Sequence, residues 1–184
     1  PAEPLTIDLA TMYSNSFPPI ANDDSRILIL GSMPGQASLR DSQYYAHPRN
    51  AFWPILCTLL DGEKSGADKD ASYQQRLNLL LQRGVAVWDV MANCYRRGSL
   101  DADIAEDSIE PNQFSPFLQH HQKVSAIYFN GAKAEQSFNR YVLADIALLY
   151  PDLHYQRLPS TSPAHASQSF EQKLAAWRNI TEYL

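Results

Sequence analysis

The amino-acid sequence predicts an α/β fold, a three-layer sandwich in which a central four-stranded parallel sheet is flanked by helices. Two observations predict it. Four short apolar runs have the length of buried strands, and segments with helical periodicity separate them. Strands that alternate with helices favour a parallel sheet with helices on both faces. The length of 184 residues suits one domain over 1–184, with residues 1–25 as an N-terminal extension.

The expected strands are continuous apolar runs followed by polar or glycine-bearing turns. RILILG, for example, leads into GSMPG, as a buried strand of a parallel sheet does. The expected strands are 26–31, 84–90, 124–129 and 153–158. The expected helices, which have apolar residues at three- and four-residue steps, are 51–60, 71–82, 111–121, 132–147 and 167–183. A stretch rich in Ser, Gly, Asp and Lys at 61–72 is typical of a surface connection.

Composition argues against several classes of protein. No apolar run approaches the roughly 20 residues that cross a bilayer, so we expect no membrane span. The N-terminus PAEPLTIDLA lacks a basic region followed by an apolar stretch, so the cytoplasm is the expected compartment. Cys57 and Cys94 lie far apart without a CxxC pair or a nearby His, and we expect two reduced core residues and no metal site.

The charge pattern bears on nucleic-acid binding. A net charge of −5 argues against a protein that wraps nucleic acid mainly through electrostatics. Acidic residues concentrate in 61–70 and 101–110, whereas basic residues fall in or beside the motifs described next. A local basic face is therefore compatible with the acidic total.

The most unusual stretches come directly after the expected strands. In a parallel sheet the ligand crevice lies beyond the carboxyl ends of the strands, so chemistry is expected there. These stretches are GSMPG at 31–35, Asp89 to Arg97, Asn130-Gly131 and STSPAH at 160–165. GSMPG lacks the GxGxxG of a dinucleotide site and the GK[ST] of a phosphate-binding loop. We therefore expect no nucleotide cofactor.

The segment QYYAHPRNAFW at 43–53 places four aromatic residues around a His, an Arg and an Asn. Aromatic faces can stack on a base swung out of a duplex, and amide side chains can hydrogen-bond a base edge or hold a water. The alternative for Phe52 and Trp53 is that both are core residues at the start of a helix.

In series, GSMPG, YYAHPRNAFW, GVAVWDV with CYRRGSLDADI, IYFNGAKA and LPSTSPAHA resemble the hypoxanthine-DNA glycosylase branch of the uracil-DNA glycosylase superfamily, over residues 26–170. The resemblance implies the fold of that superfamily and the removal of a deaminated base, hypoxanthine first, from DNA. It implies no metal and no other cofactor. The expected partner is DNA containing a deaminated base, and we expect a monomer. A uracil-specific or mismatch-specific glycosylase of the same superfamily is the alternative.

The resemblance also directs attention to the group that positions water. Better-known branches carry an Asp or Asn two residues after the opening Gly of the first motif, where this chain has Met33. The nearest suitable group is Asn50, and the resemblance points to the same residue as catalytic. Its carbonyl can accept a hydrogen bond from water while its amide donates to the sugar or a phosphate. The alternative is that Asn50 caps the helix expected at Ala51.

The expected base pocket combines strand-end residues with aromatic ones. Asp89 would accept a hydrogen bond from the N1–H of hypoxanthine, and Asn130 would donate one to a carbonyl oxygen; purely local turn roles are the alternative for both. The pocket residues expected are Gly31, Ser32, Met33, Tyr45, Phe52, Asp89 and Asn130.

STSPAH stands where the superfamily motif pinches the DNA backbone and enters the minor groove. A uracil-specific branch begins this motif with a His, and Ser160 in its place argues against efficient uracil excision. Hydroxyl and basic side chains here and elsewhere are expected to contact phosphates. The expected DNA-binding residues are Arg49, Arg96, Arg97, Lys133, Ser160, Thr161, Ser162 and His165.

Two other classes remain open. A serine hydrolase would combine Ser32 or Ser162 with His47 or His165 and with Asp89, although GSMPG does not place Ser at the centre of GxSxG. A non-catalytic nucleic-acid or nucleoside-binding module would explain why Met33 replaces the residue that directs water.

Overall fold

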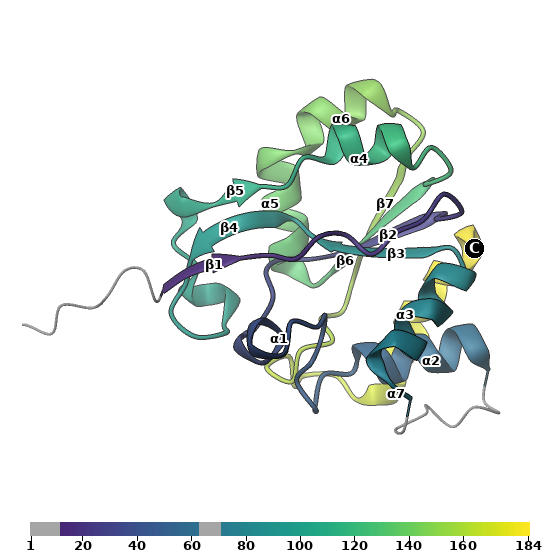
Figure 1. The fold of residues 1–184 in the computed structure, drawn as a ribbon, viewed down its shortest axis with the longest axis horizontal. Helices are drawn as coiled ribbons and strands as arrows, with labels where there is room; N and C mark the ends of the chain where they lie inside the picture. The colour runs from purple at the N-terminus through teal and green to yellow at the C-terminus, as the bar shows by residue number, and fades with distance from the viewer. Residues whose placement is uncertain (1–11, 63–70) are drawn as a thin grey trace, which may run out of the picture.

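The computed structural model, which describes residues 12–62 and 71–184, contains a four-stranded parallel sheet between two layers of helices (Figure 1). The strands are β2 (Ile27–Gly31), β3 (Val85–Asp89), β6 (Ala126–Asn130) and β7 (His154–Leu158). They lie in the order β3-β2-β6-β7, and every neighbouring pair is parallel. The predicted fold class and the four predicted strands are confirmed.

The two faces of the sheet carry separate halves of the core. Successive side chains of a strand point to opposite faces. Ile27 and Ile29 of β2 therefore pack in one apolar cluster with Trp177, whereas Leu28 and Leu30 pack in another with Phe138. These four of the five residues of β2 are fully buried, so this central strand is covered on both faces.

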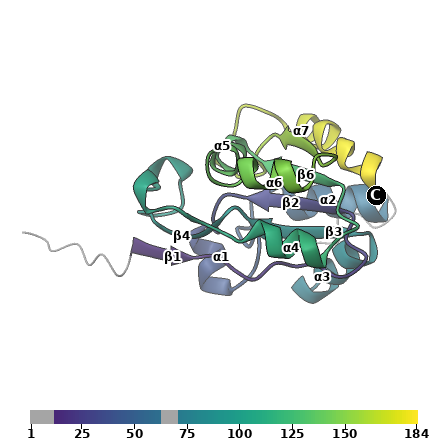
Figure 2. The ribbon, with the colours of Figure 1, turned by 90° about the horizontal axis from the view of Figure 1, so that it is seen from above.

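Helices cover each face in turn (Figures 1 and 2). One face carries α2 (Phe52–Asp61), α3 (Tyr73–Gln82) and α7 (Phe170–Trp177). The other carries α4 (Phe114–His120), α5 (Ala132–Tyr141) and α6 (Leu143–Leu149). Both α3 and α7 begin with a capping box, in which a Ser hydroxyl and a Gln amide satisfy backbone donors of the first turn.

Two predicted helices differ from the observed ones. The predicted helix 132–147 is two helices, α5 and α6, which are separated at Val142, where the backbone leaves helical geometry at φ −128°. The predicted helix 167–183 ends as an α-helix at Trp177 and continues in 3-10 turns from Arg178 to Tyr183. Of the predicted connection at 61–72, residues 63–70 lie outside the described part of the chain.

A second, antiparallel sheet was not predicted. Its order is β1-β4-β5, with β1 (Tyr13–Asn15), β4 (Met91–Tyr95) and β5 (Glu110–Pro111). β4 follows β3 after a single residue and contains polar side chains, so it lacks the apolar run that marks the other strands. The described part of the predicted N-terminal extension thus contributes a strand. The short helix α1 (Gln36–Asp41) was missed as well.

No helix in 12–62 or 71–184 has the length and apolar character needed to span a membrane.

Candidate active site

A cavity of about 700 Å³ opens at the carboxyl ends of the parallel strands, where parallel sheets place their ligands. Its volume is in the range of pockets that bind small organic molecules. Six of the seven predicted base-pocket residues line it, together with Asn50. The six are Gly31, Ser32, Met33, Tyr45, Asp89 and Asn130.

Asp89, the last residue of β3, puts a carboxyl group into the buried wall of this cavity. The residue is 4% exposed, and its Oδ2 has no hydrogen-bond partner among the described residues. Burial raises the pKa of the Asp89 carboxyl to about 7, because a charged group is poorly solvated there. Nearby Arg96 opposes this rise and Asp101 adds to it. The carboxyl therefore changes charge close to neutral pH.

Tyr45 lies beside Asp89 in an unusual backbone conformation. Its φ is 55°, in the left-handed region that a bulky residue seldom adopts. Its ring stacks on Phe52 with 3.8 Å between ring centroids. A Cβ atom on Gly31 would lie 2.6 Å from Asp89 Oδ1 and 3.1 Å from the Tyr45 hydroxyl oxygen. Only a glycine at position 31 leaves room for both side chains.

The prediction that Phe52 lines the base pocket is wrong. Phe52 is 0% exposed and begins α2 with its side chain in the core, so Tyr45 stands between its ring and the cavity. The pattern of aromatic residues indicated a pocket wall at this place. It could not show which of two aromatic residues faces the cavity.

Asn50 makes a helix-start contact and also faces the cavity. Its Oδ1 accepts a hydrogen bond from the backbone N–H of Phe52 at 2.9 Å. A carbonyl oxygen has two lone pairs, so this contact leaves one acceptor site and the amide group for other partners. The N-cap of α2 is Ala51, so Asn50 supports the helix from the position before the cap, and this contact is compatible with the proposed role toward water.

Asn130 and Thr161 join the ends of β6 and β7. Asn130 Nδ2 donates to Thr161 Oγ1 at 2.9 Å, and its Oδ1 accepts from the Thr161 backbone N–H at 2.9 Å. The Thr161 carbonyl in turn accepts from the backbone N–H of Ala51. Thr161 lines the cavity but is 1% exposed, and its hydroxyl, predicted to contact DNA, accepts a hydrogen bond from Asn130 in this structure. The contacts of Asn130 and Thr161 fix three segments to one another: the end of β6, the segment after β7 and the segment before α2.

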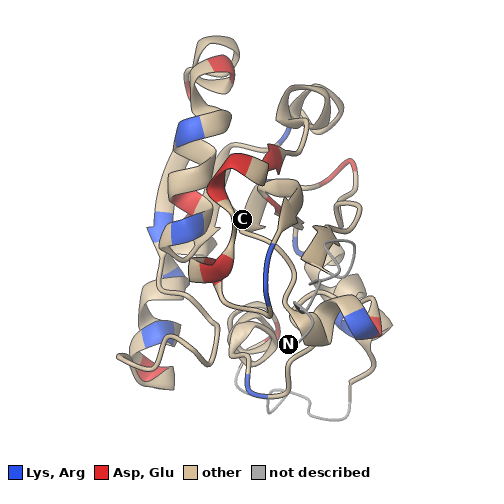
Figure 3. Cartoon of the chain, turned by 90° about the vertical axis from the view of Figure 1, so that its left-hand side faces the viewer, with Lys and Arg blue, Asp and Glu red and all other residues tan. Residues whose placement is uncertain are grey.

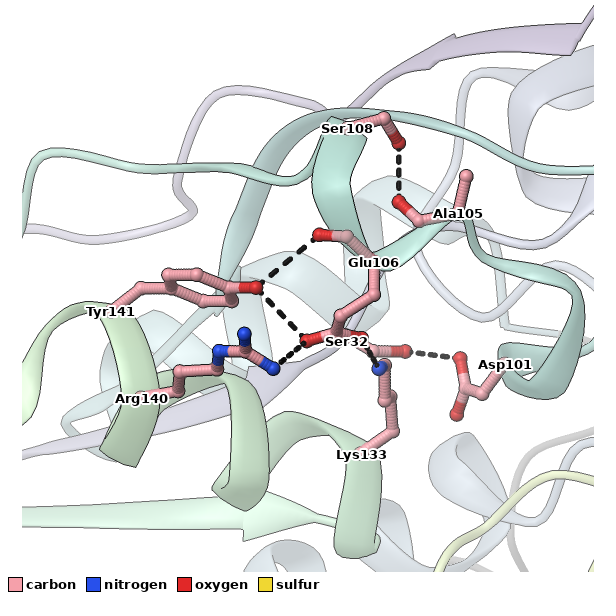
Figure 4. A network of polar contacts seen from close by, with 8 residues as sticks. All are labelled: Ser32, Asp101, Ala105, Glu106, Ser108, Lys133, Arg140 and Tyr141. Carbon is pink, nitrogen blue, oxygen red and sulfur yellow. Dashed lines mark hydrogen bonds and ion pairs between the residues drawn. The ribbon is translucent and has the colours of Figure 1, made fainter.

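Sequence reasoning missed Asp101, which lines the cavity from the segment after β4. Ser32 Oγ donates to Asp101 Oδ1 at 2.6 Å (Figure 4). The same segment is held to α5 through Glu106, which pairs with Lys133 and Arg140 and accepts from the Tyr141 hydroxyl at 2.9 Å. Asp101 follows no strand of the parallel sheet, so the rule that located the other residues did not apply to it.

Comparison with known proteins agrees with this arrangement. The model of the uracil DNA glycosylase superfamily matches residues 18–184. The chain belongs to that superfamily. The predicted family is thereby confirmed.

Relatives and solved structures make the likeness specific. The chain is 37% identical over 124 residues to the hypoxanthine DNA glycosylase of Methanosarcina barkeri (strain Fusaro / DSM 804), covering 67% of this chain and 74% of the relative. With the hypoxanthine DNA glycosylase of Methanosarcina acetivorans, the identity is 36% at the same coverage. The NMR structure of a proposed uracil DNA glycosylase from Methanosarcina acetivorans superimposes with a TM-score of 0.72 at 29% identity, covering 92% of this chain and 99% of that one.

In this superfamily member Arg96 is not available to DNA, contrary to prediction. It is 1% exposed and donates to the carbonyl oxygens of Met33 and Pro34. These hydrogen bonds hold the backbone of the GSMPG turn in place. Side chains alternate along this part of the chain, and the next residue, Arg97, is exposed instead. The pair Arg96-Arg97 in the sequence did not distinguish the two positions.

The other predicted DNA-binding residues lie in varied surroundings. Arg49 is exposed, whereas the Lys133 ammonium lines the cavity and pairs with Glu106. Ser160, Ser162 and His165 line the cavity. On the side shown in Figure 3, acidic and basic positions are interspersed and form no single basic face.

The contacts do not assemble a serine hydrolase. Ser32 donates to Asp101, and Ser162 Oγ accepts from the backbone N–H of Ala164. His47 Nδ1 accepts from the backbone N–H of Arg49, and His165 Nε2 lies near Ser167. The bond that does join a candidate serine to a candidate histidine runs between backbones, from the His165 N–H to the Ser162 carbonyl, and within the described ranges no side-chain hydrogen bond links such a pair.

We predict that Arg96→Met lowers the free energy of unfolding by about 2–4 kcal/mol, because it leaves two buried carbonyl groups without a donor. Arg97→Met, on the exposed neighbour, should change it by less than about 0.5 kcal/mol. Urea unfolding of both variants measures the difference. Equal effects of the two substitutions would contradict the supporting role of Arg96.

A second prediction concerns pH. The pKa of Asp89 rises from 3.8 to about 7 on folding, so between these values the unfolded chain has lost a proton that the folded protein keeps. The contribution of Asp89 to stability therefore falls as pH rises from 4 to 7. Asp89→Asn should gain in melting temperature relative to wild type between pH 5 and pH 8. A difference that does not change with pH would refute the buried, proton-binding carboxyl.

Proposed function

We propose that this protein is a monofunctional DNA glycosylase that hydrolyses the N-glycosidic bond of deoxyinosine in DNA and leaves an abasic site. The observation that carries the proposal is the Asp89 carboxyl, which is buried at the cavity wall with one oxygen free of protein partners. Two relatives of matching sequence bear the name hypoxanthine DNA glycosylase.

Base recognition follows from the polar pattern of hypoxanthine. A base must leave the duplex to reach a cavity of this kind. Hypoxanthine then presents an N1–H donor beside its O6 acceptor, and ionised Asp89 accepts from N1–H. Adenine has an unprotonated N1 in that place and would leave the carboxylate unpaired, which costs about 1–3 kcal/mol.

The chemical step is assigned to water held by Asn50. The free lone pair of Oδ1 accepts one hydrogen bond from water and directs its oxygen at C1′ of the sugar. The C1′–N9 bond breaks with its electron pair going to the base, a C1′–O bond forms, and the proton lost by water is taken up by the departing base. An amide is a weak base, so the rate depends on positioning and on stabilisation of the cationic sugar. Met33 can perform neither role.

The proposal is tested with oligonucleotides that carry hypoxanthine, uracil or xanthine, in single and double strands, followed by alkaline cleavage at abasic sites. Hypoxanthine should be excised fastest. Asp89→Asn should lower the ratio of the hypoxanthine rate to the uracil rate, because its amide can donate as well as accept. Absence of any abasic product would indicate a binding module, and preference for uracil would overturn the assigned substrate.

We expect Asn50→Ala to reduce single-turnover excision by about 100-fold, because water is no longer oriented. Asn50→Ser is the matched control, since a Ser hydroxyl can still accept from the Phe52 N–H and preserve the helix start. Both variants should lose activity, while only Ala should lose about 1 kcal/mol of stability. Activity of the Ser variant close to wild type would show that Asn50 is only a cap.

Binding to an uncleavable lesion duplex should weaken with salt, because neutralised phosphates release counterions. Arg49 is exposed beside the cavity, so Arg49→Ala should reduce the slope of log affinity against log salt by about 1. Arg83→Ala provides a control. This exposed arginine lies just before β3, at the amino ends of the parallel strands, whereas the cavity lies at their carboxyl ends. Equal slopes for both variants would remove Arg49 from the DNA interface.

A further inference from the structure

Two buried polar atoms of the cavity wall have no hydrogen-bond partner in the described structure: Tyr45 Oη and Asp89 Oδ2. The other buried side-chain atoms without partners belong to residues that do not line the cavity. These are Arg76, Arg96, Ser137 and Tyr155. Buried polar groups are nearly always paired, so two unpaired ones at one wall indicate that a ligand completes them.

The two side chains are also adjacent. Both approach the point where a Cβ of Gly31 would lie, as the distances of 2.6 Å to Asp89 Oδ1 and 3.1 Å to the Tyr45 oxygen show. They can therefore contact neighbouring atoms of one bound group.

Tyr45 is held in place at a cost. A bulky residue at φ 55° is strained, and such strain persists only where the surroundings impose it. The surroundings are visible: Phe52 stacks on its ring, and the preceding Tyr44 is buried with its hydroxyl donating to the Pro18 carbonyl at 2.9 Å. The constraint holds the Tyr45 hydroxyl at the cavity wall, near the Asp89 carboxyl and the Asn130 side chain.

The two groups have complementary chemistry. Burial raises the pKa of the Tyr45 phenol, so the hydroxyl stays protonated and is able to donate. Ionised Asp89 only accepts. Deamination turns an unprotonated ring nitrogen beside an amino group into a ring N–H beside a carbonyl. A donor next to an acceptor therefore fits hypoxanthine and uracil and mismatches adenine and cytosine, from which they form, whereas xanthine keeps the N1–H and carbonyl edge of its precursor guanine.

We propose that Tyr45 and Asp89 together read the lactam edge that deamination creates, with the Tyr45 hydroxyl donating to the base carbonyl and Asp89 accepting from the ring N–H. This inference rests on the proposed function and extends it to a substrate class, because hypoxanthine, xanthine and uracil all carry this edge. It moves the carbonyl-reading role from Asn130, whose amide already contacts Thr161, to Tyr45.

The test compares two forms of the protein on two substrates, as in a double-mutant cycle. Wild type and Tyr45→Phe are compared on duplexes carrying deoxyinosine or deoxynebularine, whose purine base lacks both O6 and N1–H. The Phe ring preserves the stack on Phe52. Tyr45→Phe should slow deoxyinosine excision by about 10- to 100-fold and change deoxynebularine excision by less than about 2-fold. Tyr155→Phe, which removes another buried unpaired hydroxyl away from the cavity, should leave both rates unchanged.

Equal losses on both substrates would show a structural role for Tyr45 and overturn the proposal, as would unchanged excision of deoxyinosine. Affinity for duplexes with the uncleavable 2′-fluoro forms of both nucleosides gives a second readout. Suppose that wild type prefers the 2′-fluoro inosine duplex and that Tyr45→Phe loses this preference, but that no abasic site forms. The proposed glycosylase function would then be wrong, and the proposed recognition of the lactam edge would stand. Equal affinity of wild type for both duplexes would overturn the reading itself.

Discussion

The arrangement of the site depends on one constraint, the burial of the Asp89 carboxyl without a partner for Oδ2. An unpaired buried polar group costs free energy, and a buried charge costs more. Three features make it tolerable: Gly31 leaves space for the carboxyl, Arg96 lies near enough to favour its ionised form, and the raised pKa allows it to remain neutral. Arg96 itself is buried because it holds the turn after β2, so the support of the turn and the electrostatics of Asp89 share one residue.

The remaining strand ends are joined by hydrogen bonds that also fix the segment of Asn50, the residue for which we propose a catalytic role. Thr161 connects Asn130 after β6 to the backbone of Ala51, directly after Asn50. Asn50 is therefore positioned twice, by its own bond to the Phe52 N–H and by the bond from its neighbour. A residue that acts by orienting water needs such fixation, because its rate contribution depends on geometry more than on basicity. The loss of an acid or amide at Met33 is consistent with a site that works by position.

Sequence predicted the features that depend on local pattern and missed those that depend on packing. Apolar runs located all four parallel strands. The rule that ligands bind at the carboxyl ends of parallel strands located Asp89, Asn130 and the GSMPG turn. β4 was missed because it is partly polar and continues almost directly from β3. Arg96 and Arg97 are equivalent in sequence, and only the contacts of Arg96 with the Met33 and Pro34 carbonyls, more than 60 residues away, distinguish the buried residue from the exposed one. Asp101 reaches the cavity through a contact with Ser32 that spans 69 residues, which no local pattern reports.

A pKa near 7 gives Asp89 different states in the empty and filled site. Only the ionised carboxyl can accept from a ring N–H without also presenting a proton, so a deaminated base selects that form. Were the carboxyl fully ionised in the empty cavity, folding would have to bury an uncompensated charge in every molecule. With its pKa close to neutral, a large share of empty sites is uncharged, and the charge becomes fixed when the N–H of a base is present to stabilise it. In the ionised form that we propose for base recognition, Asp89 favours a base with a ring N–H, because the unprotonated N1 of adenine offers no proton that would stabilise the charge.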